Sequence, residues 1–124
     1  MRVLVVDDES SNLAFLSAVL RAAGYDTELA QNGDDALDKT GPFDLLLTDV
    51  MMPRMRGDAL ASKMRERDPQ LPVLYVTAYS DHLFSSRFVL SEGEAFLEKP
   101  VTPDALLEGV EMVLYGRLAK AVWG

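Results

Sequence analysis

The stretch LLLTDVMMPRMRG, from Leu45 to Gly57, decides the fold class, because an apolar run here ends on a carboxylate. Residues 43–48 (FDLLLT) are apolar almost throughout, which is typical of a parallel strand covered on both faces. Asp49 follows this run, and Pro53 then interrupts the chain before a helical pattern begins at Gly57. Whether Asp49 carries a function depends on how the other strands end.

Similar short runs lie on both sides of this stretch and alternate with helical patterns. The expected strands are residues 2–6 (RVLVV), 27–31 (TELAQ), 43–48, 72–76 and 95–97. The first expected helix has Ser10 or Ser11 as N-cap and stops before Gly24. Three further helices are expected over residues 33–39, 57–67 and 80–93. The last helix begins at Thr102–Pro103 and runs through Leu118. This alternation predicts βαβ units on a parallel sheet, in one α/β domain over residues 1–124.

The composition narrows the class of protein. A chain of 124 residues with 48% apolar residues suits one domain, and no run approaches the roughly 18 apolar residues of a membrane span. The first residues lack the features of a signal peptide, so we expect a cytoplasmic protein. There is no cysteine and one histidine, His82, which excludes disulfides, thiol nucleophiles and a zinc site. The net charge of −8 argues against direct nucleic-acid binding and favours protein partners or a small cation.

Polar residues follow four of the five expected strands. The first strand ends in Asp7–Asp8, the third in Asp49, the fourth in Thr77, and the fifth in a segment that contains Lys99. The carboxyl ends of parallel strands share one edge of the sheet, where ligands bind in open α/β folds. We therefore expect three carboxylates, a hydroxyl and an ammonium group to converge.

This set of groups suits phosphoryl chemistry. Three adjacent acids repel one another, so they hold a proton or bind a cation, and oxygen ligands favour Mg²⁺. A metal ion and a lysine neutralise phosphoryl oxygens while a carboxylate attacks phosphorus in line. The expected product is an aspartyl phosphate.

With these residues in place, the sequence resembles the receiver domain of two-component response regulators over essentially the whole chain. The resemblance rests on four segments in order, VVDDE (5–9), LLLTDVMMPRMRG (45–57), VLYVTAY (73–79) and FLEKP (96–100). It implies a flavodoxin-like, doubly wound sheet of five parallel strands in the order 2-1-3-4-5, with five helices. Residues 80–100 look more like the receivers of hybrid sensor kinases. The chain is either a stand-alone receiver or a piece of a longer protein.

The resemblance also implies roles for the residues at the strand ends. Asp49 would accept a phosphoryl group from a phosphohistidine on a sensor histidine kinase or a histidine phosphotransfer domain. Asp8, Asp49 and the Met51 carbonyl would bind Mg²⁺ or Mn²⁺, with Asp7 acting through water. The domain would catalyse its own phosphorylation and slow autodephosphorylation without being an enzyme in the usual sense.

Further roles concern the phosphoryl group and the signal. Lys99 and Ala78 would bind phosphoryl oxygens, Thr77 would bond another, and Phe96 would change rotamer. The Lys99–Pro100 bond is expected to be cis. The surface of the fourth helix, fifth strand and fifth helix would then change for a partner, which is an output domain or a second copy of the chain.

Each of these residues also has a simpler interpretation. Asp7 and Asp8 are suited to capping the first helix, and Asp49 to an Asx-turn. Lys99 before a proline is most often a solvated side chain, and a phenylalanine such as Phe96 usually packs in a core. In the shared site, Lys99 would be an exposed cation that pairs only with the ligand and contributes little to stability. Coincidence at four strand ends is less economical than one shared site.

Three rival functions remain to be weighed. A phosphohydrolase of the aspartyl-phosphate type needs a second aspartate two residues after the nucleophile, where this chain has Met51. A nucleotide hydrolase needs a glycine-rich phosphate loop, which is absent. A degenerate receiver that acts only as an adaptor is disfavoured by the intact acids, threonine and lysine.

A metal-binding patch of Met51, Met52 and Met55 is rejected, because spaced methionines usually pack in the core.

Overall fold

The structure, a computed structural model, describes residues 1–78 and 93–115. Its elements in chain order are β1 (Arg2–Val6), α1 (Ser10–Ala22), β2 (Asp26–Ala30), α2 (Gly33–Asp38), β3 (Leu45–Thr48), α3 (Gly57–Arg67), β4 (Val73–Thr77), β5 (Glu94–Glu98) and α5 (Pro103–Leu114). The helix expected over residues 80–93 and the extension of the last helix to Leu118 fall outside the described residues. Within the described ranges, no helix combines the length and apolarity needed to cross a membrane.

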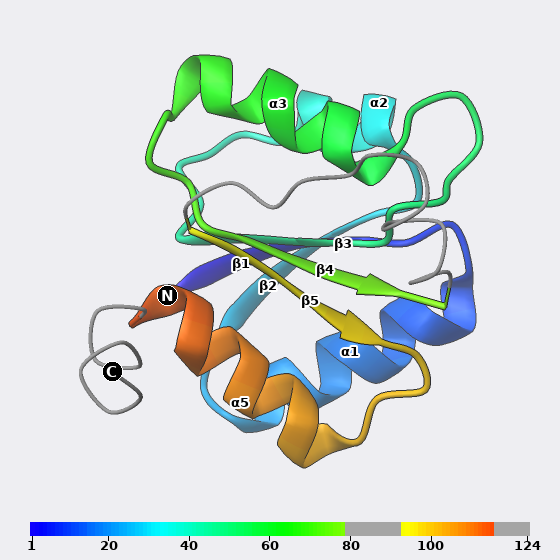
Figure 1. Ribbon diagram of the computed structural model, residues 1–124, viewed down its shortest axis with the longest axis vertical. Helices are drawn as coiled ribbons and strands as arrows, with labels where there is room; N and C mark the ends of the chain where they lie inside the picture. The colour runs from blue at the N-terminus through cyan, green and yellow to red at the C-terminus, as the bar shows by residue number, and fades with distance from the viewer. Residues whose placement is uncertain (79–92, 116–124) are drawn as a thin grey trace.

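The five strands form one parallel sheet in the order β2-β1-β3-β4-β5. Val3 pairs with Leu45 and Leu46 with Val73, so β3 lies at the centre. Helices α1 and α5 cover one face of the sheet, and α2 and α3 cover the other (Figure 1). This arrangement confirms the predicted doubly wound fold and strand order.

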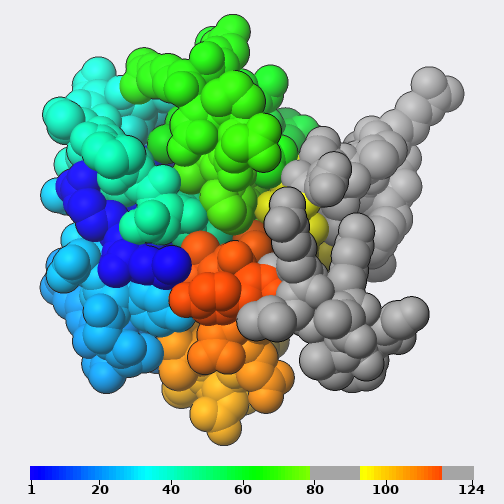
Figure 2. Space-filling view, turned by 90° about the vertical axis from the view of Figure 1, so that its left-hand side faces the viewer, coloured from blue at the N-terminus to red at the C-terminus, as the bar shows by residue number. Residues whose placement is uncertain are grey.

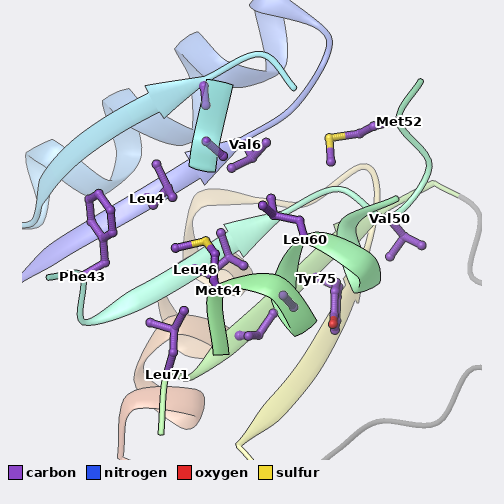
Figure 3. Packing of buried hydrophobic residues seen from close by; sticks show 14 residues of the cluster. Leu4, Val6, Phe43, Leu46, Val50, Met52, Leu60, Met64, Leu71 and Tyr75 are labelled. Atoms are coloured by element: carbon purple, nitrogen blue, oxygen red, sulfur yellow. The ribbon is translucent and has the colours of Figure 1, made fainter. Parts of the chain in front are cut away.

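The apolar runs of β1, β3 and β4 reflect burial on both faces of the sheet. All four residues of β3 are buried, and alternate residues enter different cores. Leu46 joins the cluster beneath α3, whereas Leu45 and Leu47 join the cluster beneath α1 and α5. Figure 3 shows the first cluster, in which Leu60 and Met64 of α3 lie over the sheet.

Helices α1 and α5, which share one face of the sheet, begin differently from each other. The prediction of Ser10 or Ser11 as N-cap of α1 is wrong, because Glu9 occupies that position without a side-chain cap. Both serines lie within the helix. For α5 the prediction is confirmed, since Thr102 Oγ1 accepts a hydrogen bond from the Ala105 amide at 3.1 Å and Pro103 begins the helix.

The outer strand β5 is longer than the three residues expected from sequence. Its pairing with β4 extends from Val73 opposite Glu94 to Thr77 opposite Glu98. Strand β3 is shorter than expected, because Phe43 lies before the ladder and packs its ring against the Arg2 guanidinium at 4.7 Å. Main-chain pairing with neighbouring strands determines where β3 and β5 begin and end, and the local amino-acid composition does not indicate that pairing.

A buried ion pair joins α3 to the start of β5. Arg65 Nη1 lies 2.7 Å from Glu94 Oε2, and its Nε and Nη2 donate to the Leu71 carbonyl at 2.9 and 2.7 Å. Tyr75 donates its hydroxyl proton to the same Glu94 oxygen at 3.3 Å. Burial, followed by the charge of Glu94, raises the pKa of Tyr75 far above its ordinary 10.0, so this phenol stays neutral.

We expect Glu94→Ala to lower the free energy of unfolding by about 3 kcal/mol, because it leaves the buried Arg65 guanidinium without this carboxylate. Urea denaturation of the purified protein measures the change. Glu28→Ala is the matched control, since its Arg2 pair is largely exposed and should contribute less than about 1 kcal/mol. Equal losses in the two variants would contradict a structural role for the buried pair.

The starts of the strands lie at the opposite edge of the sheet from their carboxyl ends. Figure 2 shows this edge, where the first residues and the last turn of α5 lie side by side. Tyr115 Oη lies 4.0 Å from Met1 Sδ at this place. The acids predicted to converge are at the other edge.

Candidate functional site

Two buried acids extend neighbouring strands at the carboxyl edge of the sheet. The Asp7 amide donates to the Ala30 carbonyl at 3.2 Å, and the Asp49 amide donates to the Val6 carbonyl at 3.1 Å. These bonds continue the parallel ladders past β1 and β3 and bring the two acids together. One carboxylate oxygen each from Asp7, Asp8 and Asp49 lies within 4.8 Å of the others, so the predicted convergence is present.

The three carboxylates differ in exposure and in partners. Asp7 and Asp49 are buried, whereas Asp8 is exposed. Asp7 Oδ1 accepts from the Glu9 amide at 2.9 Å, and Asp49 Oδ1 accepts from the Met51 amide at 3.3 Å. The Asx-turn interaction expected of Asp49 is therefore present together with the shared site, whereas Asp7 and Asp8 do not occupy the N-cap of α1, which is Glu9.

Lys99 bridges the two buried carboxylates. Its Nζ lies 2.8 Å from Asp7 Oδ2 and 3.0 Å from Asp49 Oδ2, and its side chain is 17% exposed. The Lys99 amide donates to the Thr77 carbonyl at 2.8 Å, which places the residue beside the end of β4. The expectation of an exposed lysine with no protein partner is wrong, because two adjacent buried acids require a nearby cation.

The pKa of Lys99 results from opposing effects. Burial lowers it, but the hydrogen bonds and charges of Asp7 and Asp49 outweigh burial and raise the pKa above its ordinary 10.5. The ammonium group is therefore charged at neutral pH. Its contribution to stability is fully present below pH 10.5 and is lost as the pH rises through the higher folded-state pKa.

The remaining predicted residues lie at or near the ends of β3, β4 and β5. Thr77 is the buried last residue of β4, and Ala78 after it is exposed. Phe96 pairs with Tyr75 across β4 and β5 and packs against the core cluster under α3, so its rotamer change stays a prediction. The Met51 side chain is exposed. The Lys99–Pro100 bond is cis, as predicted.

Glycine at position 57 allows α3 to begin directly against the end of β3. The Gly57 amide donates to the Val50 carbonyl at 2.8 Å. A Cβ atom on residue 57 would overlap the Asp49 carbonyl oxygen and lie 2.9 Å from its carbon. The sequence marked Gly57 as part of a motif, but its contact with the main chain of Asp49 emerges only from the fold.

Two features of this region were not anticipated. Thr48 is fully buried and donates its hydroxyl proton to the Asp49 carbonyl at 2.9 Å. The only sequence feature that could have indicated this buried hydroxyl is the presence of a polar β-branched residue at the end of an apolar strand. Arg54 has a φ of +68° in the loop before α3, and nothing in an arginine side chain indicates that conformation.

An open hollow of about 490 Å³ lies beside Lys99, between α1 and the segment that follows β5. It is mostly apolar and is lined by Asn12, Phe15, Leu16, Val76, Ala78, Lys99, Pro100 and Val101. The hollow gives access to the carboxyl edge from the side of α1.

The donor set fits a hard divalent cation. The clustered atoms are all carboxylate oxygens, the ligands that Mg²⁺ prefers, and one of the three acids faces solvent. Sulfur and imidazole ligands are not part of this cluster. The structure therefore supports Mg²⁺ rather than a softer metal at the site.

Comparisons with known proteins agree with this architecture. A family model described as "Response regulator receiver domain" matches residues 3–111. The transcriptional regulatory protein DltR of Streptococcus agalactiae is 33% identical over 114 residues, which cover 90% of this chain and 51% of DltR. The chain thus spans about half the length of that relative.

Two solved structures have the same fold. The response regulator TrrA from Thermotoga maritima, in complex with Mg²⁺–BeF, has a TM-score of 0.80 at 33% identity, covering 90% of this chain and 97% of TrrA. The receiver domain of the hybrid histidine kinase CckA has a TM-score of 0.77 at 32% identity, covering 92% and 99%. With the family model matching most of its length, this chain belongs to the response regulator receiver domain family of two-component signalling.

Proposed function

We propose that this receiver accepts a phosphoryl group on Asp49 from a phosphohistidine, carried by a sensor histidine kinase or a histidine phosphotransfer domain. Phosphorylation and Mg²⁺ binding are typical of the family. The observation that carries the proposal is the Lys99 ammonium held between Asp7 and Asp49 at 2.8 and 3.0 Å. It places a positive charge directly beside the carboxylate that would attack.

The transfer is a displacement at phosphorus. An Asp49 carboxylate oxygen attacks, the bond from phosphorus to the imidazole nitrogen breaks, and its electron pair stays on the imidazole. Lys99 exchanges its bond to Asp49 for one to a phosphoryl oxygen, which preserves its charge pairing. Thr77 and Ala78, at the end of β4, supply further donors to the phosphoryl group.

Divalent metal binding belongs to the same proposal. Asp8, Asp49 and the Met51 carbonyl would hold Mg²⁺ or Mn²⁺, with Asp7 acting through water. Both Asp7 oxygens already accept protein hydrogen bonds, whereas Asp8 is exposed, which supports this division of roles. When bound, the metal ion neutralises charge on the phosphoryl oxygens.

The phosphorylated form would act as a signal through β5 and α5. Thr77 turning toward the phosphoryl group would release space that Phe96 enters, and the helix predicted over residues 80–93 would complete the output surface. The partner would be an output domain or a second copy of the chain, in the cytoplasm. The net charge of −8 supports protein partners rather than direct DNA contact by this domain.

Incubation with acetyl phosphate and Mg²⁺ should raise the intact mass by one phosphoryl group, and Asp49→Asn should abolish the gain. The amide lacks the anionic oxygen that attacks phosphorus. Asp38→Asn, which removes an exposed acid at the end of α2, is the control and should leave labelling unchanged. Labelling that survives Asp49→Asn, or that persists in EDTA, would refute the proposal.

A further inference from the structure

The loop from Val50 to Arg56 connects the acceptor residue to α3 and carries Met51. It is closed at its base by the 2.8 Å bond from the Gly57 amide to the Val50 carbonyl. Its tip contains Arg54, whose φ of +68° is uncommon for a residue other than glycine. A backbone in that conformation persists only where surrounding contacts hold it.

One such contact is the Met55 side chain. Met55 is partly buried and packs against the core cluster under α3. It also lies directly over Gly33, the first residue of α2, on the same face of the sheet. A Cβ atom added to Gly33 would overlap Met55 Sδ and lie 3.0 Å from both Cβ and Cγ of Met55.

This contact cannot be relieved by side-chain rotation alone. Rotation about the Met55 side-chain bonds moves the sulfur away, but Met55 Cβ is fixed to the main chain. A separation of 3.0 Å between the two Cβ atoms therefore requires the main chain of one partner to shift by a few tenths of an ångström. Either α2 or the loop must move.

The start of α2 is the better anchored of the two. Asn32 caps it by accepting the Asp35 amide at 2.7 Å, and the Asn32 carbonyl accepts the Ala36 amide at 3.0 Å. Strand β2 ends two residues earlier, at Ala30, whose carbonyl accepts the amide of Asp7. The loop that contains Arg54, with its positive φ, is therefore the part whose main chain shifts.

We propose that Gly33 is a positioning residue for the phosphoacceptor site, because its lack of a side chain lets Met55 seat against α2 and hold the loop that carries Met51. The expected effect on Mg²⁺ binding rests on the proposed function, whereas the role of Gly33 in positioning the loop rests on the Gly33–Met55 contact. The methionine spacing that indicated packing in the sequence thus has a defined partner. Gly33 acts on metal binding through Met55 and touches no reacting atom.

The test compares Gly33→Ala with the wild-type 124-residue protein. Alanine favours a helix over glycine, so the substitution alone should not weaken α2. We expect the dissociation constant for Mg²⁺, measured by calorimetry, to rise about tenfold, as for other residues that orient metal ligands. In metal-free protein, the Gly57 amide should exchange with solvent deuterium faster than in wild type.

A double-mutant cycle with Met55→Ala separates the mechanism from general damage. Met55→Ala should itself weaken Mg²⁺ binding, and Gly33→Ala should add no further loss in that background, because the obstructing side chain is gone. Gly109→Ala is the matched control. Its new Cβ would lie 2.8 Å from Leu97 Cδ1 on the other face of the sheet, so it perturbs packing there without changing Gly57 exchange or Mg²⁺ affinity.

Three results would overturn the inference: unchanged Gly57 exchange in Gly33→Ala, an equal loss from Gly33→Ala in the Met55→Ala background, or the same changes in Gly109→Ala. Wild-type protein that fails to bind Mg²⁺ would instead refute the proposed function. The exchange measurements need no metal, so they decide the role of Gly33 in positioning the loop in either case.

Discussion

Lys99→Ala is expected to slow phosphoryl transfer to Asp49 by about a hundredfold, because it removes charge-assisted hydrogen bonds worth about 3 kcal/mol in total at the reacting centre. In the metal-free protein the same change leaves Asp7 and Asp49 without the cation that bridges them. We therefore also expect the free energy of unfolding at pH 7 to fall by about 2 kcal/mol. This differs from the prediction of an exposed lysine with little effect on stability.

The pH dependence of that loss tests its electrostatic origin. Because Lys99 loses its proton as the pH rises above 10.5 through the higher folded-state pKa, the difference in stability between wild type and Lys99→Ala should shrink over that range. Lys39→Ala is the control, because Lys39 makes a more exposed pair with Asp35 at 3.8 Å. A loss in Lys99→Ala that is independent of pH would contradict the account of a compensated acid pair.

Gly57→Ala is expected to lower the free energy of unfolding by about 3 kcal/mol and to reduce phosphoryl acceptance. The new methyl group would meet the main chain of Asp49 and Val50, at 2.9 Å from the Asp49 carbonyl carbon and 3.1 Å from Val50 Cα. Main-chain atoms cannot rotate away, so relief requires the end of β3 and the start of α3 to separate. That movement displaces the acceptor itself.

Gly41→Ala provides the matched control for Gly57→Ala. Its Cβ would lie 3.5 Å from the nearest atom, the Phe43 amide nitrogen, which is an ordinary van der Waals contact. We expect a change within about 0.5 kcal/mol and unaltered phosphorylation. Urea denaturation and intact-mass labelling measure both properties. Similar behaviour of the two variants would show that the close approach at Gly57 is not needed.

Much of the fold is predictable because burial on both faces leaves a direct mark on composition. Strands β1, β3 and β4 read as apolar runs, and α3 matches its predicted range of residues 57–67. Thr102 and Pro103 mark the start of α5 through hydrogen-bonding and φ preferences that act locally. The parallel sheet follows from alternation, and its order from the family resemblance.

The features that sequence reasoning missed are one helix start and several contacts between distant segments. The N-cap of α1 is Glu9, although the serines after it are the better capping residues by type. The burial of Lys99 arises from pairing with acids 92 and 50 residues away. The contact between Gly33 and Met55 likewise joins the start of α2 to the loop before α3, which no local pattern relates.

The convergence of the acids was predictable in position but not in detail. Strand ends at one edge account for the proximity of Asp7, Asp8 and Asp49. The sequence does not predict which of these acids is buried and which is exposed. Asp7 accepts hydrogen bonds from the Glu9 amide through Oδ1 and from Lys99 through Oδ2, and the pairing with Lys99 depends on the fold. Those hydrogen bonds support the separate roles proposed for Asp7 and Asp8.

The most direct test of the central claim is to locate the phosphoryl group chemically. Sodium borohydride reduces an aspartyl phosphate to homoserine, so protein phosphorylated in Mg²⁺ and then reduced can be digested and mapped by mass spectrometry. The account predicts homoserine at residue 49 and at no other aspartate. Homoserine at residue 7 or 8, or a phosphoryl group that survives reduction on another residue type, would contradict it.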